Sequence, residues 1–313
     1  MQPHPALSLL RLAALSASTM PDEETLDLMF ERVEAGALAG MVASDVWPEL
    51  ERGLMSPMPS NMLRALYACG ALKEVLPEVA ALFGVPQIAD DPQEVDIGQH
   101  LLRVLDEAAR CGASLEVRFA AMVMHVGKSD SPPEHLPVHY RHIDRGQPRI
   151  AAICERFGVS TACRELAMFA LVECERVHRV SEVRAGPVAA MLERLGAFDQ
   201  SQYFTQLMTL CACDYRAYPR RSTQDYPKAK LLNIALQACA CIDQTGLSNG
   251  HGKDAASENE IRHAHSPHSN PLPEGEGTNE RLREFHVNDA LQEARAAAIA
   301  AVFGSARWSQ SQT

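Results

Sequence analysis

The densest cluster of basic residues in the sequence is the stretch Tyr215-Arg216-Ala217-Tyr218-Pro219-Arg220-Arg221. Guanidinium groups bind phosphate oxygens and aromatic rings stack on bases, so this mixture is typical of surfaces that bind a nucleic-acid backbone. An equally open interpretation is a helix end capped by cations before a loop. Together with three arginines that lie beside histidines, the candidate RNA-binding residues are Arg141, Arg145, Arg149, Arg216, Arg220 and Arg221.

Nine cysteines offer a second kind of chemistry, because thiolates bind metal ions. They are scattered among helix-like apolar runs, which is typical of buried thiols in a reducing cytoplasm. The two closest pairs, Cys211/Cys213 and Cys239/Cys241, have C-x-C spacing, whereas most zinc knuckles have C-x2-C spacing. We therefore expect a cytoplasmic protein with reduced thiols and no structural zinc knuckle.

The composition limits how these residues can be used. The chain has 313 residues, of which 46% are hydrophobic, enough to fill a sizeable core. Its formal net charge is −11, from 40 acidic and 29 basic residues, which argues against binding of polyanions by overall charge. Any nucleic-acid contact must therefore be a local patch. The apolar segment Leu7–Leu15 lacks the charged start of a signal peptide and is too short to span a membrane.

Helices must position these side chains, because apolar residues recur at intervals of three and four along most of the chain. One such stripe follows the acidic start Pro21–Glu24 and consists of Leu26, Met29, Phe30 and Val33. We expect further helices to begin near Pro59, Gln99, Leu115, Gln147, Ala162, Pro187, Gln202, Lys228 and Val287. The sequence therefore predicts an all-α fold.

Breaks in this pattern divide the chain into four parts. Proline-rich turns between residues 84 and 95 separate a first helical bundle, 1–88, from a histidine-rich part, 89–244. Residues 245–280 turn to Gly, Ser, Asn, His and Pro without an apolar stripe, which predicts a disordered insertion. The apolar pattern returns in a C-terminal helix within 281–313.

Five runs in the first part resemble the neck and body of bacterial CCA-adding tRNA nucleotidyltransferases. They are Glu49–Met55, Pro59–Leu63, Cys69–Leu72, Leu76–Val79 and Leu82–Gln87. Upstream, Leu9–Ala13 is similar to a family motif whose arginines face the incoming nucleotide, which makes Arg11 the candidate nucleotide-binding residue. Downstream, Ile97–His100 and Val117–Ala121 open a part similar to the family's HD-type phosphohydrolase domain. The resemblance covers roughly residues 7–308.

The family's nucleotidyl transfer activity is not expected of this chain. Transfer of CMP or AMP needs two metal ions held by a D-x-D pair beside a Gly-Ser turn, and the sequence holds no such combination. The family carries these elements in an N-terminal domain of which this chain holds no copy. We therefore expect no nucleotidyl transfer by the chain itself. The expected partners are tRNA and either a separate nucleotidyltransferase chain or a second copy of this chain.

The family's HD-type domain holds one or two divalent ions with His and Asp side chains, including an adjacent His-Asp pair. In the matching segment, Met124 stands in place of the histidine and His125 in place of the aspartate. A thioether is a poor ligand for hard cations, and imidazole lacks the negative charge that holds two cations together. The resemblance thus leaves a candidate metal set, for Ni, Mn or Mg, of His100, His125, His142, Cys174 and Asp214.

Two interpretations of this set are open. Its members form a remodelled site for one metal ion, or they are remnants held by hydrogen bonds inside a helical bundle. Cys174 and Glu175 stand where the family has a second His-Asp pair, which also argues against two metal ions. The leading hypothesis is a tRNA-binding protein with a degenerate HD-type domain. The alternative is a metal-dependent phosphohydrolase that acts on 2′,3′-cyclic phosphates or phosphomonoesters.

Overall fold

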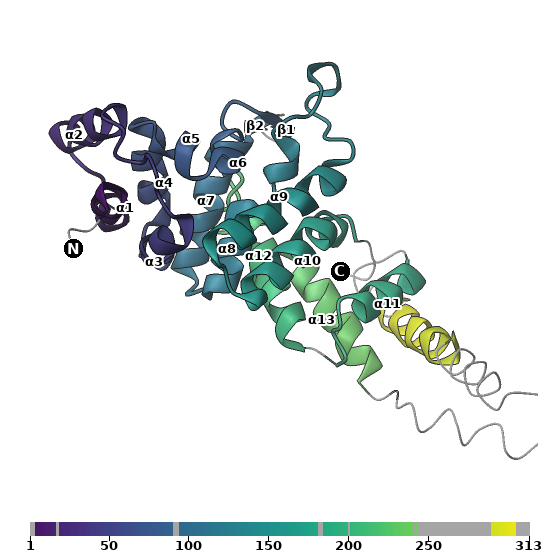
Figure 1. Cartoon of the computed structure of the whole chain (residues 1–313). Helices are drawn as coiled ribbons and strands as arrows, with labels where there is room; N and C mark the ends of the chain where they lie inside the picture. Colours follow the sequence, from purple (N-terminus) through teal and green to yellow (C-terminus); the bar gives the residue numbers. More distant parts are fainter. Residues whose placement is uncertain are drawn as a thin grey trace, which may run out of the picture. The chain divides into compact units, whose positions relative to one another are not determined.

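The structure, a computed structural model, describes residues 4–16, 19–89, 94–180, 184–199, 201–240, 242 and 289–304. Helices dominate these ranges (Figure 1), which confirms the predicted all-α fold. The α-helices are α1 (Pro5–Ser16), α2 (Glu23–Glu34), α3 (Ala43–Leu54), α4 (Pro59–Ala68), α5 (Ala71–Val75), α6 (Pro77–Ala80), α7 (Ile97–Arg110), α8 (Leu115–Val123), α9 (His142–Phe157), α10 (Thr161–His178), α11 (Ala185–Arg194), α12 (Ser201–Arg216) and α13 (Pro227–Cys239). The remaining elements are the 3-10 turns η1 (Val126–Lys128) and η2 (Pro133–His135) and the antiparallel strands β1 (Pro86–Ile88) and β2 (Glu94–Asp96).

Local sequence explains where several helices begin and end. The carboxylate of Asp22 accepts a hydrogen bond from the backbone N–H of Thr25 (2.9 Å) and caps α2. In the same way, Asp96 accepts one from the backbone N–H of Gln99 (2.7 Å) and caps α7. Gly158 ends α9 with a φ of 65°, a left-handed conformation that glycine adopts without strain. Capping residues therefore fix one boundary each of α7 and α9, two helices that contribute to the site described below.

Among the described residues, the predicted helix starts lie within one turn of the observed ones except that of α9, and the start predicted near Val287 lies outside these residues. We expected this helix to begin near Gln147, but it begins at His142 and contains Pro148. The predicted start was wrong because a proline removes one helix hydrogen bond but does not end a helix that packing holds, and α9 packs against η1 and α10. The pair β1–β2 was not predicted, since three-residue strands are too short to show alternation.

The chain divides into two compact units, which are described separately. The first consists of Met1–Arg179 and Gln200–Ala229, and the second of Val180–Asp199 and Lys230–Thr313. In the first unit, α1 packs against α3 and α4, while α8 and α12 pack against each other and against α7 and α10 (Figure 1). The boundary expected at residue 88 falls inside this unit and stays a prediction.

In the second unit, the described part of the C-terminal region is helical over residues 289–304. Arg295 in this helix forms an ion pair with Glu193 of α11. The insertion predicted at 245–280 lies outside the described residues. Among the helices that the structure describes, none is both long and apolar enough to cross a lipid bilayer.

Candidate functional site

A cavity of about 960 Å³ lies in the first unit. Its wall is built from β1, the turn after α8, the N-terminal part of α9, the C-terminal parts of α10 and α12, and the start of α13. The titratable residues among its lining include Lys128, His142, Glu175 and His178. The fold thus gathers chemically active side chains from segments that lie far apart in the sequence.

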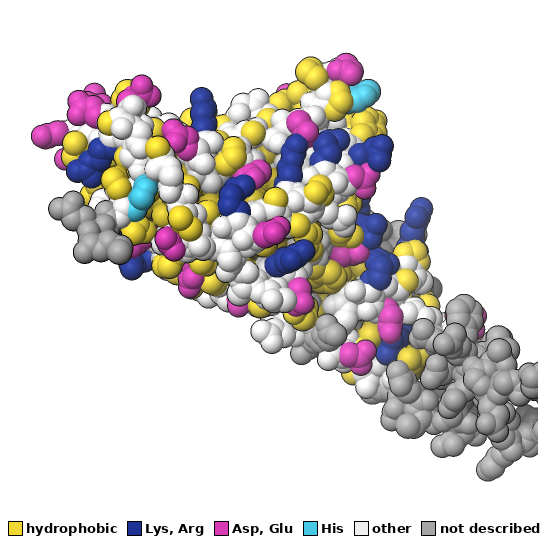
Figure 2. All heavy atoms as spheres, in the orientation of Figure 1, with side chains coloured by type: hydrophobic (Ala, Val, Ile, Leu, Met, Phe, Trp, Pro, Cys, Tyr) yellow, Lys and Arg dark blue, Asp and Glu magenta, His cyan; other side chains and the backbone are white. Residues whose placement is uncertain are grey.

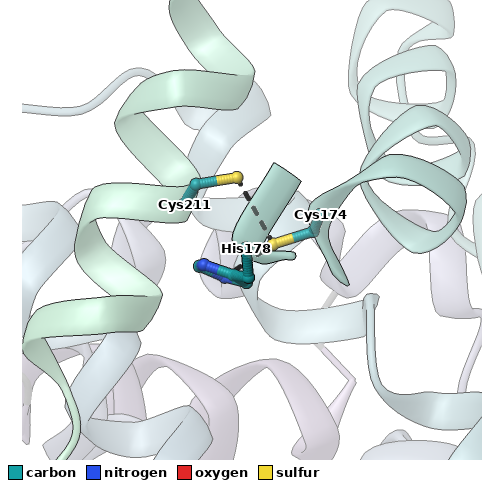
Figure 3. A group of neighbouring side chains, drawn as sticks. All are labelled: Cys174, His178 and Cys211. Atoms are coloured by element: carbon teal, nitrogen blue, oxygen red, sulfur yellow. Dashed lines mark hydrogen bonds between the residues drawn. The ribbon is translucent and has the colours of Figure 1, made fainter. Parts of the chain in front are cut away.

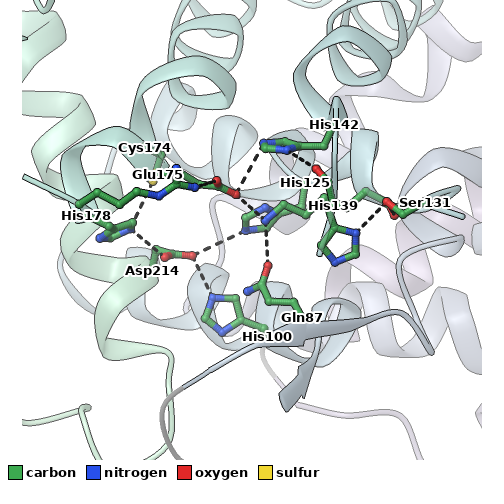
Figure 4. Close-up of polar contacts among 12 residues, drawn as sticks. Gln87, His100, His125, Ser131, His139, His142, Cys174, Glu175, His178 and Asp214 are labelled. Carbon is green, nitrogen blue, oxygen red and sulfur yellow. Dashed lines mark hydrogen bonds and ion pairs between the residues drawn. The ribbon is translucent and has the colours of Figure 1, made fainter. Parts of the chain in front are cut away.

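Three side chains from three elements meet beside this cavity (Figure 4): His100 of α7, His125 after α8, and Asp214 of α12. We call them the imidazole cluster. His100 Nε2 lies 2.9 Å from Asp214 Oδ1, and His125 Nε2 lies 3.7 Å from the same oxygen. The ligand atoms of all three residues lie within 4.8 Å of one another, and all three side chains are buried. The cluster therefore has the ligand types and the spacing for one cation.

Two nitrogen atoms of the imidazole cluster have no hydrogen-bond partner: His100 Nδ1 and His125 Nε2. Buried polar atoms in proteins are normally satisfied, so each orphan calls for an explanation. Burial lowers the pKa of His125 to about 4, and the charge of Lys128 acts in the same direction. His125 is therefore neutral at pH 7, with an unpaired nitrogen near the carboxylate, which is the form that binds a metal ion.

A lysine ammonium is buried beside the imidazole cluster. Lys128 is only 4% exposed; its Nζ donates a hydrogen bond to Gln87 Oε1 (2.8 Å) and pairs with Glu175 Oε1 (3.0 Å). Gly127 allows this turn to lie against α9, because a Cβ there would collide with the carbonyl oxygen of His142. Burial raises the pKa of Glu175, but Lys128 and His142 outweigh it and hold that pKa at about 2. The cavity wall therefore carries an ion pair whose lysine is buried.

Met124 lies between α8 and His125, and it lines the cavity while being only 2% exposed. Its side chain ends in a thioether, which is neutral and is a weak ligand for hard cations. The residue therefore adds no charge and no suitable ligand to the imidazole cluster.

A second group, the thiol cluster, consists of Cys174 and His178 of α10 and Cys211 of α12 (Figure 3). Cys174 Sγ lies 3.5 Å from Cys211 Sγ and 3.5 Å from His178 Nε2. His178 Nε2 also lies 3.0 Å from Asp214 Oδ2, and His178 Nδ1 lies 2.8 Å from the hydroxyl oxygen of Tyr226. Asp214 thus contacts both clusters, with one carboxylate oxygen toward each (Figure 4).

The protonation of the thiol cluster follows from its surroundings. The hydrogen bond to Cys211 and burial raise the pKa of the Cys174 thiol well above its usual value. Burial lowers the pKa of His178, but the hydrogen bond to the Asp214 carboxylate outweighs it and raises that pKa above its usual value. With no cation bound, the cluster therefore contains a neutral Cys174 thiol and a His178 imidazolium paired with the Asp214 carboxylate.

The five residues predicted as metal ligands do not lie in one group. His100, His125 and Asp214 come together, whereas Cys174 belongs to the thiol cluster and His142 lies apart, with its Nε2 3.6 Å from Glu175 Oε1. Whether any of them binds metal stays a prediction. The sequence interpretation missed Cys211 and Tyr226, and it noted His178 as similar to a family histidine without counting it among the metal ligands.

The first three predicted RNA-binding arginines differ in how far they face solvent. Arg141 has a side chain that is 82% exposed and pairs with Asp144 (2.9 Å). Arg145 and Arg149 both pair with Asp130, and they also donate to carbonyl oxygens of the segment between α8 and α9. These two arginines therefore hold that segment in place, and Arg141 is the most exposed of the three.

The other predicted RNA-binding arginines follow the end of α12. Arg216 donates a hydrogen bond to the carbonyl oxygen of Gln224, and the guanidinium of Arg221 lies over the rings of Tyr215 and Tyr218. Arg220 has a φ of 65° in the turn that follows α12. On the face drawn in Figure 2, basic side chains are interspersed with acidic and apolar ones.

Arg11, the predicted nucleotide-binding residue, lies on α1. Its Nε and Nη2 both donate to Glu49 Oε1, at 3.1 and 3.0 Å, while Glu49 also pairs with Arg52. The buried Glu49 carboxylate therefore ties α1 to α3, and the side chain of Arg11 remains 56% exposed. Nucleotide binding by Arg11 stays a prediction.

Most of the chain is similar in sequence to one group of curated proteins. No model of a known protein family matches the sequence. The multifunctional CCA protein of Burkholderia vietnamiensis is 41% identical over 249 residues, 80% of this chain and 60% of the relative. That of Burkholderia cenocepacia is 40% identical over 257 residues, 82% of this chain and 62% of the relative. The chain thus spans about three fifths of the length of these relatives.

Proposed function

The chain is homologous to the multifunctional CCA proteins over four fifths of its length, and we propose that it is a tRNA-binding derivative of them. In this proposal, residues 1–88 are the helical body and residues 89–244 are a degenerate HD-type domain. The 313 residues transfer no nucleotide by themselves, because they hold no D-x-D pair beside a Gly-Ser turn. Incorporation of labelled CMP or AMP into tRNA without its 3′ end, above a buffer control, would disprove this part.

The side chains in the cavity wall support the proposal that the HD-type domain is degenerate. Two divalent cations need bridging carboxylates, but Met124 supplies a thioether and Lys128 supplies an ammonium. The Lys128 charge is paired with Glu175, so that carboxylate is already engaged. The residues therefore do not fit a pair of metal ions, and no reaction step is derived through one.

Support for tRNA binding comes from cations around the cavity. Arg141, Arg179, Arg221 and Lys228 line it together with Lys128, in a chain whose net charge is −11. The side chains of Arg141 and Arg179 are 82% and 75% exposed, so their guanidinium groups can reach a ligand in solvent. A local group of cations is what an acidic protein needs to bind a phosphate backbone.

The test is binding of fluorescently labelled tRNA to Arg141→Ala and Arg179→Ala as the salt concentration is varied. Each variant should weaken binding roughly threefold to tenfold and reduce the salt slope by about one. Arg110→Ala is the matched control, because Arg110 is also exposed and paired with an acid three residues away but does not line the cavity. Equal effects of all three variants, or no binding by the natural chain, would refute the proposal.

A second candidate function is metal-dependent hydrolysis of phosphate esters at a single cation. The orphan nitrogens of His100 and His125 beside Asp214 favour it, since these residues would hold one divalent ion. Such an ion would activate water. Such hydrolysis would depend on His100 and Asp214. In the tRNA-binding proposal, by contrast, these two buried residues make no contact with RNA.

A further inference from the structure

Two helices of the first unit bring four potential metal ligands together. Cys174 and His178 are separated by four positions on α10, and Cys211 and Asp214 by three on α12. Residues at these separations lie on the same face of a helix, so α10 and α12 present both pairs to each other. The resemblance to the CCA proteins predicts no role for Cys211.

The distances within the thiol cluster match those between ligands of one tetrahedral zinc ion. Bond lengths of about 2.3 Å to sulfur and 2.0–2.1 Å to nitrogen imply separations of roughly 3.8 Å between sulfurs and 3.6 Å between sulfur and nitrogen. The observed separations from Cys174 Sγ are 3.5 Å to Cys211 Sγ and 3.5 Å to His178 Nε2. Both separations from Cys174 Sγ are thus close to those of a zinc site, and all three ligand atoms lie within 4.8 Å of one another.

The histidine of the thiol cluster is also held in the orientation that a ligand needs. Its Nδ1 lies 2.8 Å from the Tyr226 hydroxyl oxygen, which can accept a hydrogen bond from Nδ1–H, and Nε2 then faces the sulfur of Cys174. Such a partner on the second ring nitrogen is typical of metal-binding histidines. Asp214 Oδ2 lies 3.0 Å from His178 Nε2, and both residues line the cavity, so the fourth position is open to this carboxylate or to water.

A second thiol pair in the same unit provides a contrast. Cys213, also on α12, has its Sγ 3.6 Å from that of Cys111, and both belong to no group of three potential metal ligands among the described residues. Two close thiols therefore do not define a metal site by themselves. Cys174 and Cys211 are accompanied by the oriented imidazole of His178, which is a third potential ligand.

We propose that Cys174, Cys211 and His178 bind one zinc ion. Binding replaces the two thiol protons and the Nε2 proton of His178, and all three protons pass to solvent. The two thiolates then balance the charge of the ion. This site is independent of tRNA binding and of hydrolysis, and it differs from the imidazole cluster in its thiolate ligands.

The test begins with untagged protein, purified under reducing conditions and analysed for zinc, followed by replacement of zinc with cobalt. The natural chain should hold one zinc, and its cobalt form should show the intense absorption of sulfur-to-cobalt charge transfer. Cys211→Ser and Cys174→Ser should lose that absorption and bind zinc at least tenfold more weakly. Cys213→Ser is the matched control, a buried thiol two positions along α12, and it should behave as the natural chain does.

Three results would overturn the proposal. One is a natural chain that binds no zinc at micromolar concentration although circular dichroism shows it to be folded. Another is cobalt bound without charge-transfer absorption, which would place the ion at the imidazole cluster. The third is a Cys174–Cys211 disulfide, found by mass spectrometry in protein alkylated without prior reduction.

Discussion

The imidazole cluster and the thiol cluster share Asp214 but differ in what else surrounds them. Beside the imidazole cluster lies Lys128, a buried ammonium that already neutralises Glu175. In the thiol cluster the ring of His178 is the only cationic side chain of the group, and its proton is exchangeable. This pairing leaves little net charge beside the imidazole cluster, whereas the thiols can lose their protons and supply negative charge to a bound metal ion.

The two clusters therefore indicate that ligand types alone do not decide where a cation binds. The imidazole cluster contains two histidines and an aspartate, but the ion pair of Lys128 and Glu175 beside it adds little net charge that could attract a cation. The thiol cluster has fewer nitrogen and oxygen ligands, but its thiolates can neutralise the ion completely. Of the two groups, the thiol cluster is therefore the better site for zinc.

The largest expected effect is stabilisation of the natural chain by zinc. A ligand that binds only the folded state at a hundredfold excess over its Kd stabilises by about 2.7 kcal/mol. Zinc should therefore raise the melting temperature of the natural chain and of Cys213→Ser, but not that of Cys211→Ser. Thermal unfolding with and without added zinc measures this, and equal shifts in all three proteins would remove the distinction between the clusters.

The next effect concerns the ion pair of Lys128 and Glu175. Lys128→Met leaves the Glu175 carboxylate and the amide oxygen of Gln87 without their partner and should lower the free energy of unfolding by about 2 kcal/mol. Lys73→Met, at an exposed position of α5, serves as the control and should change stability little. Urea denaturation of both variants measures this change in stability. An unchanged midpoint for Lys128→Met would mean that the ammonium does not stabilise the cavity wall.

The smallest effect is expected from the hydroxyl that orients His178. Tyr226→Phe removes the partner of His178 Nδ1 and should weaken zinc binding roughly tenfold, about 1.4 kcal/mol. Tyr203→Phe removes a hydroxyl that bonds to Glu165 on the surface and should leave zinc affinity as it is. Competition with a chromophoric chelator gives both values, and similar affinities for the two variants would argue against His178 as a ligand.

Much of the fold could be predicted from the sequence because most helices carry their own apolar stripe and their own boundary residues. The stripe of α2 and the proline at the start of α4 are local signals, and both elements were found. The early start of α9 depends on packing against η1, which no local pattern reveals.

The sites could be predicted only in part. The resemblance pointed to His100, His125 and Asp214, which the fold does bring together. The Cys211/Cys213 pair was treated as one C-x-C unit, but two positions along a helix point to different sides, so Cys211 meets α10 and Cys213 meets Cys111. The spacing of Cys174 and His178 on α10 was the signal that could have indicated the thiol cluster.

We propose that the cavity does not hold a pair of divalent ions for hydrolysis of phosphate esters. The most direct test of this claim is hydrolysis of 2′,3′-cyclic AMP with nickel, manganese or magnesium by two proteins. One is the natural chain and the other carries Met124→His, His125→Asp, Cys174→His and Glu175→Asp. We predict no metal-stimulated turnover by the natural chain and measurable turnover by the quadruple variant. Turnover by the natural chain that depends on metal and is lost in both His100→Ala and Asp214→Ala would contradict the claim.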